Sequence, residues 1–210
     1  MKQTYIEEFW NALSHGMGTL FGLAALVLMI VFSSEYDHAI TIVASAIYGS
    51  TLVLLYSASA LYHVCRSIER KKLFKKLDHS SIYLLIAGSY TPFALVTMHG
   101  ALGWTIFGII WSLAAMGLVF KLFFTGRYNY LSLTMYLLMG WLIVIAIKPL
   151  MHDLRFGGLV WLVIGGLCYT LGAIFYAYDS RVKYFHFVWH LFVLAGSICQ
   201  FFSVLYYVIL

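Results

Sequence analysis

Charged residues are scarce in this sequence. Only 10% of its 210 residues are Asp, Glu, Lys or Arg, whereas 63% are hydrophobic. Soluble domains carry a charge on about a quarter of their residues, because charged side chains cover much of the surface in contact with water. The shortage of charge therefore excludes a soluble domain and predicts an integral membrane protein along the whole chain.

Cysteine is also rare, and the sequence lacks a recognisable cleavable leader. Cys65, Cys168 and Cys199 fall at or inside apolar runs without Cys-x-x-Cys spacing. Because that spacing is absent, a disulfide framework and a thiolate zinc site are excluded, and we interpret the three cysteines as apolar filler.

At the N-terminus, Lys2 is offset by two glutamates, and no small-residue cleavage site follows the first apolar run. We expect this segment to be retained as a membrane span.

Long hydrophobic runs are what the sequence has in abundance. A helix needs about 20 predominantly apolar residues to cross a bilayer. Seven runs approach this length, so we predict an all-α integral membrane protein with a single seven-helix transmembrane domain over residues 1–210. The runs are Gly16–Phe32, Ile40–Tyr62, Ser81–Met98, Leu102–Phe124, Leu131–Ile147, Leu159–Ala177 and Phe185–Leu210.

Positive charge alternates along the connections between these runs. Basic residues crowd positions 66–76 in the second connection, and others flank the fourth and sixth. The first, third and fifth connections hold only Lys148 and Arg155. Cytoplasmic connections are enriched in Lys and Arg, so we expect the N-terminus in the cytoplasm and the C-terminus outside. The stretch 66–76 then acts as a topology signal that attracts anionic lipid, and it does not indicate nucleic-acid binding.

Small residues and one proline predict local features inside the runs. Gly18 and Gly22 form a small-xxx-small pair, and further glycines at 165, 166 and 172 are expected to let helices approach closely. Pro92 lies inside the third run, where it lacks a backbone donor and is predicted to kink the helix.

The last run carries two histidines, His186 and His190, four residues apart. On a helix this spacing places both imidazoles on one face, where they can share one ion. Histidine inside a membrane is costly unless it is paired or coordinated. The pair therefore predicts half of a metal site.

The expected topology supplies a third imidazole at a similar depth. His186 and His190 would lie about one and two turns into the membrane from the cytoplasm, and His63 about one turn deep in the second span, at 5.4 Å per turn. Three neutral imidazoles match a catalytic zinc site, which keeps its fourth position open for water. We predict that His63, His186 and His190 bind Zn²⁺.

Other polar residues enter the membrane at the same end. Asp78 opens the third span and is predicted to take up a proton or orient water, with Ser59 nearby as a hydrogen-bonding group. The alternative for Asp78 is to complement the N-terminus of its helix. Glu8, Asn11 and His15 precede or enter the first span, and we expect them around the metal rather than bound to it.

Four further histidines fall in or beside connections. They are interpreted as satisfied residues at the membrane interface rather than ligands. They are His38, His79, His99 and His152.

Taken together, these pieces resemble the hemolysin III family, the bacterial branch of the progestin and adipoQ receptor superfamily. The motifs are Glu8-x-x-Asn11-x-x-Ser14-His15, Ser59-x-x-x-His63, Asp78 followed by Gly88-Ser-Tyr-Thr-Pro92, and His186-x-x-x-His190. The resemblance implies seven helices with the N-terminus inside, zinc on the three histidines, and Ser59 and Asp78 near its bound water.

The resemblance also implies a function by analogy, because relatives are associated with ceramidase-like activity. We therefore expect a zinc-dependent hydrolase of a membrane lipid amide or ester, influencing lipid homeostasis. One alternative is a non-catalytic regulator of membrane order with structural zinc. Another is a pore, as the family name suggests, although a pore needs polar lining across the full membrane thickness, whereas the costly polar residues here concentrate in the inner half.

Overall fold

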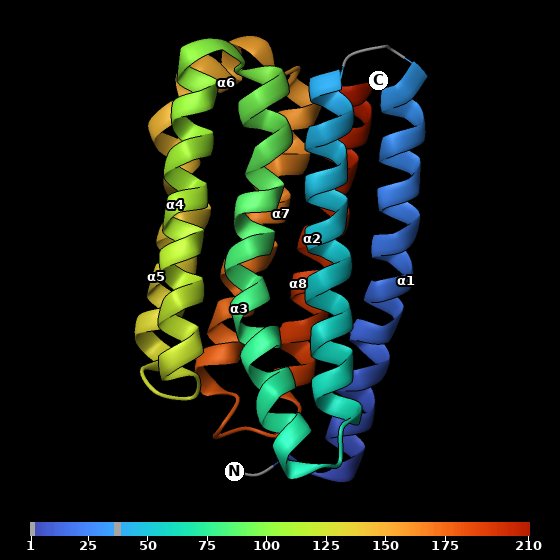
Figure 1. Cartoon of the computed structure of the whole chain (residues 1–210), viewed down its shortest axis with the longest axis vertical. Helices are drawn as coiled ribbons and strands as arrows, with labels where there is room; N and C mark the ends of the chain where they lie inside the picture. The colour runs from blue at the N-terminus through green and yellow to red at the C-terminus, as the bar shows by residue number, and fades with distance from the viewer. Residues whose placement is uncertain (1–2, 36–38) are drawn as a thin grey trace.

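The computed structural model describes residues 3–35 and 39–210, and helices account for nearly all of them (Figure 1). Seven helical segments are long and apolar enough to cross a membrane, which confirms the predicted all-α membrane fold. The α-helices are α1 (Tyr5–Glu35), α2 (Ala39–Val64), α3 (Ile68–Pro92), α4 (Gly100–Phe124), α5 (Asn129–Trp141), α6 (Ile147–Asp153), α7 (Phe156–Tyr178) and α8 (Phe185–Val204). Helices α5 and α6 belong to one span, Asn129–Asp153. The short segments are η1 (Phe93–Thr97), η2 (Leu142–Ala146) and η3 (Leu205–Ile209).

The helices run side by side along the long axis of the bundle (Figure 1). The two chain ends lie at opposite ends of the bundle, as an odd number of spans requires. Helix α1 packs against both α2 and α8, so it joins the second span to the last one. The first and last thirds of the chain are thereby brought together at the N-terminal end of α1. Which end of the bundle faces the cytoplasm stays a prediction, based on the distribution of Lys and Arg in the connections.

Two helices begin earlier than the apolar runs indicate. Helix α1 starts at Tyr5 and α3 at Ile68, so most of the basic stretch 66–76 lies on the first turns of α3. Hydropathy marks only the part of a helix inside hydrocarbon, and these polar turns extend beyond it. Asp78 consequently lies within α3, where its side chain is buried.

Glycines allow close helix contacts at most of the predicted positions. A side chain at Gly18 would collide with the Tyr56 ring, and one at Gly22 would press on the α2 backbone. Gly165 and Gly172 of α7 meet α8 in the same way. Gly166 differs, because a side chain there would meet nothing within 4 Å.

The segments η1, η2 and η3 depart from α-helical geometry within the spans, and the partners of the first two are clear. After Pro92, helix α3 widens into the π-helical segment η1, in which Met98 N–H donates to the Phe93 carbonyl at 2.8 Å. Helix α5 breaks into η2, and the Tyr90 hydroxyl from α3 fills this break. It accepts the Ile143 N–H at 2.8 Å and lies 2.7 Å from the Gly140 carbonyl oxygen. Irregular backbone is tolerated in a membrane only where such partners satisfy it.

We predict that Tyr90→Phe destabilises the protein by roughly 1–3 kcal/mol, because the Ile143 N–H loses its acceptor in an apolar setting. Thermal unfolding in detergent measures the effect. Tyr206→Phe is the matched control, since Tyr206 is half exposed on α8's extension. Equal unfolding midpoints for the two variants would contradict the assigned role of Tyr90.

The predicted orientation is testable at Cys65, a partly exposed residue directly after α2. In a variant that keeps only this cysteine, a membrane-impermeant maleimide should label permeabilised cells but not intact ones. A control variant with its single cysteine at position 152, in the α6–α7 region, should label in intact cells. The reverse pattern would place the N-terminus outside.

Candidate metal centre

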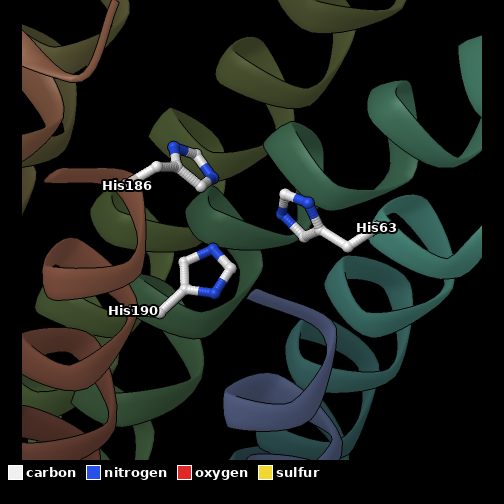
Figure 2. A group of neighbouring side chains, drawn as sticks. All are labelled: His63, His186 and His190. Atoms are coloured by element: carbon white, nitrogen blue, oxygen red, sulfur yellow. The ribbon is translucent and has the colours of Figure 1, made fainter. Parts of the chain in front are cut away.

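Three histidines converge at one end of the bundle. His63 lies in the last turn of α2, and His186 and His190 occupy the first two turns of α8. Figure 2 shows one nitrogen of each ring facing a common space. One ligand atom from each residue lies within 4.8 Å of the others, close enough to hold one metal ion. In the part of the chain that the structure describes, these are the His, Cys, Asp or Glu residues that lie close enough together to hold a metal ion. The fold therefore brings the three predicted ligands together.

Each ring is oriented by a partner at its Nδ1 atom. His63 donates to a Glu8 carboxylate oxygen at 2.6 Å, and His186 donates to Asp179 at 2.8 Å. His190 Nδ1 lies 3.2 Å from the backbone oxygen of Asn11. A carbonyl or carboxylate oxygen only accepts, so these contacts place the proton on Nδ1 and leave the Nε2 lone pair free for a cation.

The free nitrogens are buried without a protein partner. His63 Nε2 and His186 Nε2 make no hydrogen bond to any residue in the described ranges. Orphaned polar atoms of this kind are rare in interiors and indicate a missing ion or water. The carboxylates of Glu8 and Asp179 bring negative charge beside the rings, which offsets a divalent cation in low dielectric. The donor set therefore fits a metal.

Helix α1 stabilises the three histidines without contributing a ligand. Glu8 bridges His63 and Lys71, whose amine donates to the second carboxylate oxygen at 2.5 Å. Glu7 is buried and accepts the Tyr184 N–H at 2.8 Å. Tyr184 has a φ of 63°, a left-handed conformation that is unfavourable for a bulky residue. The Glu7 contact thus helps to fix the start of α8 two residues before His186.

His15 and Asn11 lie near the cluster, as predicted, but not as ligands. The His15 ring stacks on His190 with centroids 3.5 Å apart and planes 7° from parallel. Both His15 nitrogens lack a partner among the described residues. Asn11 acts through its backbone oxygen, while its side chain donates to Gln3 at 3.2 Å.

Asp78 and Ser59 lie beside the histidines on α3 and α2. Asp78 is buried and within electrostatic range of His186. The buried Ser59 hydroxyl lies close to the Asp78 carboxylate without a well-oriented hydrogen bond to any described residue. Asp78 does not belong to the ligand cluster.

The other histidines only partly follow the prediction. His99 is exposed, and His152 is exposed and pairs with Asp153 at 2.6 Å, as expected near a membrane surface. His79 corrects the prediction, because it is buried on α3 and its Nδ1 atom has no partner among described residues. His38 lies outside the described residues. All three cysteines are free, in line with the sequence.

Sequence reasoning missed two acidic residues of the site. Asp179 stands in a basic connection seven residues before His186, and its only signal was a carboxylate placed among positive charges. From the sequence, Glu7 was interpreted only as a negative charge that makes a signal peptide unfavourable. Both contacts depend on how α1 and the α7–α8 connection fold over the cluster, which spacing does not reveal.

Seven membrane-spanning helices around a buried three-histidine cluster define a polytopic membrane protein with a candidate metal centre near one membrane surface. The sequence profile described as "Haemolysin-III related" matches residues 3–201. The chain belongs to this family, and it is a multi-pass protein of the cell membrane.

Its relatives are similar over nearly their whole length. "Hemolysin-3" of Bacillus cereus is 46% identical over 209 residues, covering 100% of this chain and 95% of the relative. "Hemolysin-3 homolog" of Bacillus subtilis (strain 168) is 46% identical and covers 97% and 95%. The human "Monocyte to macrophage differentiation factor" is 27% identical and covers 97% and 85%. No solved structure matches significantly.

We predict that Asp179→Asn weakens metal binding by about 10- to 100-fold, because the His186 ring loses its charged anchor. Competition with a chelator of known affinity measures the change. Asp153→Asn is a matched control, since it alters a similar Asp–His pair at a site remote from the cluster. An unchanged affinity in Asp179→Asn would contradict the anchoring role.

Proposed function

We propose that the three-histidine cluster holds Zn²⁺ and that the protein is a zinc-dependent hydrolase of a membrane lipid amide or ester. The observation that supports this most is the set of three oriented imidazoles with free Nε2 atoms beside a carboxylate that is not a ligand. Neutral imidazoles suit zinc, and the site offers neither thiolates nor the oxygen ligands that calcium or magnesium prefer. When bound, zinc supplies Lewis acidity to a carbonyl and lowers the pKa of water.

Two cavities of different polarity share a lining residue, and one of them borders the cluster at His186. A polar cavity of about 560 Å³ is bordered by Glu8, Asp179 and His186. An apolar cavity of about 160 Å³ lies between α3, α5, α7 and α8. Leu133 borders both. An amphipathic molecule with its polar group near the histidines and a hydrocarbon chain in the apolar cavity matches this pairing.

The apolar cavity reaches the lipid-facing surface. Its lining includes Trp141, Val144 and Val163, which are 40%, 52% and 47% exposed. These residues lie on α5, η2 and α7, in segments that span the membrane. An acyl chain can therefore enter sideways from the bilayer, which favours a lipid substrate over a water-soluble one.

The chain's own residues then divide the work of hydrolysis. Asp78 takes the proton of the attacking water on a carboxylate oxygen and passes it to the leaving amine or alcohol. The Ser59 hydroxyl, which has no well-oriented protein partner, donates to the water or to the developing oxyanion. His15 and the Glu8–Lys71 pair keep the imidazoles in place. In the net hydrolysis, water contributes OH to the acid product and H to the leaving amine or alcohol.

A metal with a purely structural role is the alternative class of function. In that case the ion would join α2 to α8, and the protein would regulate membrane order without turnover. The names of the bacterial relatives suggest a third possibility, haemolysis, which a pore would cause. The buried Asp, Glu, Lys and His side chains of the described residues gather near one end of the bundle, whereas a pore needs polar lining throughout.

The decisive variant is Asp78→Asn. We expect it to retain the metal and to lose turnover by roughly 10²- to 10⁴-fold, the usual contribution of a proton-transfer group. Metal content and mass spectrometry of a membrane lipid extract, before and after incubation with purified protein, provide the two readouts. The triple variant His63→Ala, His186→Ala, His190→Ala should lose both.

Asp153→Asn serves as the control that should keep both metal and turnover. Hydrolysis that persists in the triple variant would end the enzyme proposal. Full biological activity in Asp78→Asn, together with no new lipid product from the wild-type protein, would instead support the structural-metal alternative.

A further inference from the structure

Within the described part of the chain, one lysine lies inside the bundle without a counter-charge, on a helix that carries none of the three histidines. Lys121 is in the last turn of α4, and its side chain is fully buried at 0% exposure. Its Nζ atom has no hydrogen-bond partner among the residues the structure describes. A buried ammonium without a partner is strongly unfavourable, because burial removes its hydration. A lysine near a helix C-terminus often caps the last carbonyls, but the Lys121 amine makes no such bond.

The groups around Lys121 add further positive charge and hydrogen-bonding capacity. His79 and Lys75, one turn apart on α3, both lie within electrostatic range of Lys121. Helix α3 packs against α4, and the Lys75 amine lies 3.7 Å from where a Cβ on Gly126 would sit, five residues beyond Lys121. His79 Nδ1 is buried without a partner, and so is the hydroxyl of the adjacent Ser80. Lys121 Nζ and His79 Nδ1 are thus two unpartnered polar atoms from different helices that lie within electrostatic range of each other.

Two residues of this region border the polar cavity that Glu8 and Asp179 also line. His79 and Lys75 line the cavity. The carboxylates of that cavity are engaged elsewhere, Glu8 with His63 and Lys71, and Asp179 with His186. Asp78 is the carboxylate that acts on Lys75. No carboxylate of the described chain acts comparably on Lys121, so the region retains excess positive charge.

We propose that Lys121, Lys75 and His79 form a binding site for a phosphate group, carried by a lipid headgroup or by free phosphate. The cavity gives an anion access to Lys75 and His79, and the buried Lys121 ammonium adds a further unpartnered positive charge behind them. A phosphate suits the site because its several oxygens accept from ammonium and imidazole groups at once, and its charge balances the two lysines. This site does not require that the protein hydrolyse anything, and it is separate from the three metal-binding histidines.

Binding measured without turnover tests this proposal. Purified metal-loaded protein in neutral detergent is titrated with inorganic phosphate at constant ionic strength, and separately with phosphatidic acid against diacylglycerol. We expect the unfolding midpoint of the wild type to rise with at least one phosphate probe and not with diacylglycerol. Lys121→Met should weaken this binding by at least about tenfold, since a charge-assisted hydrogen bond is lost. Lys121→Arg should keep it.

The matched control is Lys76→Met, which removes an exposed charge from the same α3 turn. If Lys121→Met does not fold, Lys75→Met tests the same site, because Lys75 is only partly buried. A response to phosphatidic acid alone assigns a lipid headgroup, and a response to inorganic phosphate alone assigns a free anion. No response to either probe, or an equal response in wild type and Lys121→Met, would overturn the site. Neither result depends on the hydrolase assay.

Discussion

The structure depends on how buried imidazoles satisfy their two ring nitrogens in an apolar bundle. For His63, His186 and His190, an oxygen from elsewhere in the chain occupies Nδ1, which directs Nε2 inwards. Removal of these nitrogens from water is unfavourable unless something binds them. The three rings lie close enough together for one shared cation to satisfy all of them at once.

Helix α1 is central to this arrangement although it contributes no ligand. Its first turns supply Glu8 to His63, the Asn11 carbonyl to His190, and Glu7 to the backbone that precedes His186. These contacts explain why a polar, partly charged turn precedes the apolar part of the first span. The same turns border the polar cavity through Glu8, so they shape both the centre and the route to it.

Much of this was predictable from sequence, and the limits have physical causes. Hydropathy located the seven spans, and helical spacing with depth selected His63, His186 and His190, because these signals are local. Hydropathy did not detect the polar first turns of α3. Spacing also could not show that His79 turns inwards or that Asp179 reaches His186, since each depends on side-chain packing between segments distant in the sequence.

The distribution of the ligands along the chain has a consequence for biogenesis. His63 is made early, whereas His186 and His190 belong to the last helix to leave the ribosome. The centre therefore cannot form until the final span has entered the bilayer and docked against the first two. Binding of the proposed ion would therefore distinguish a fully inserted chain from one that stops at an earlier helix.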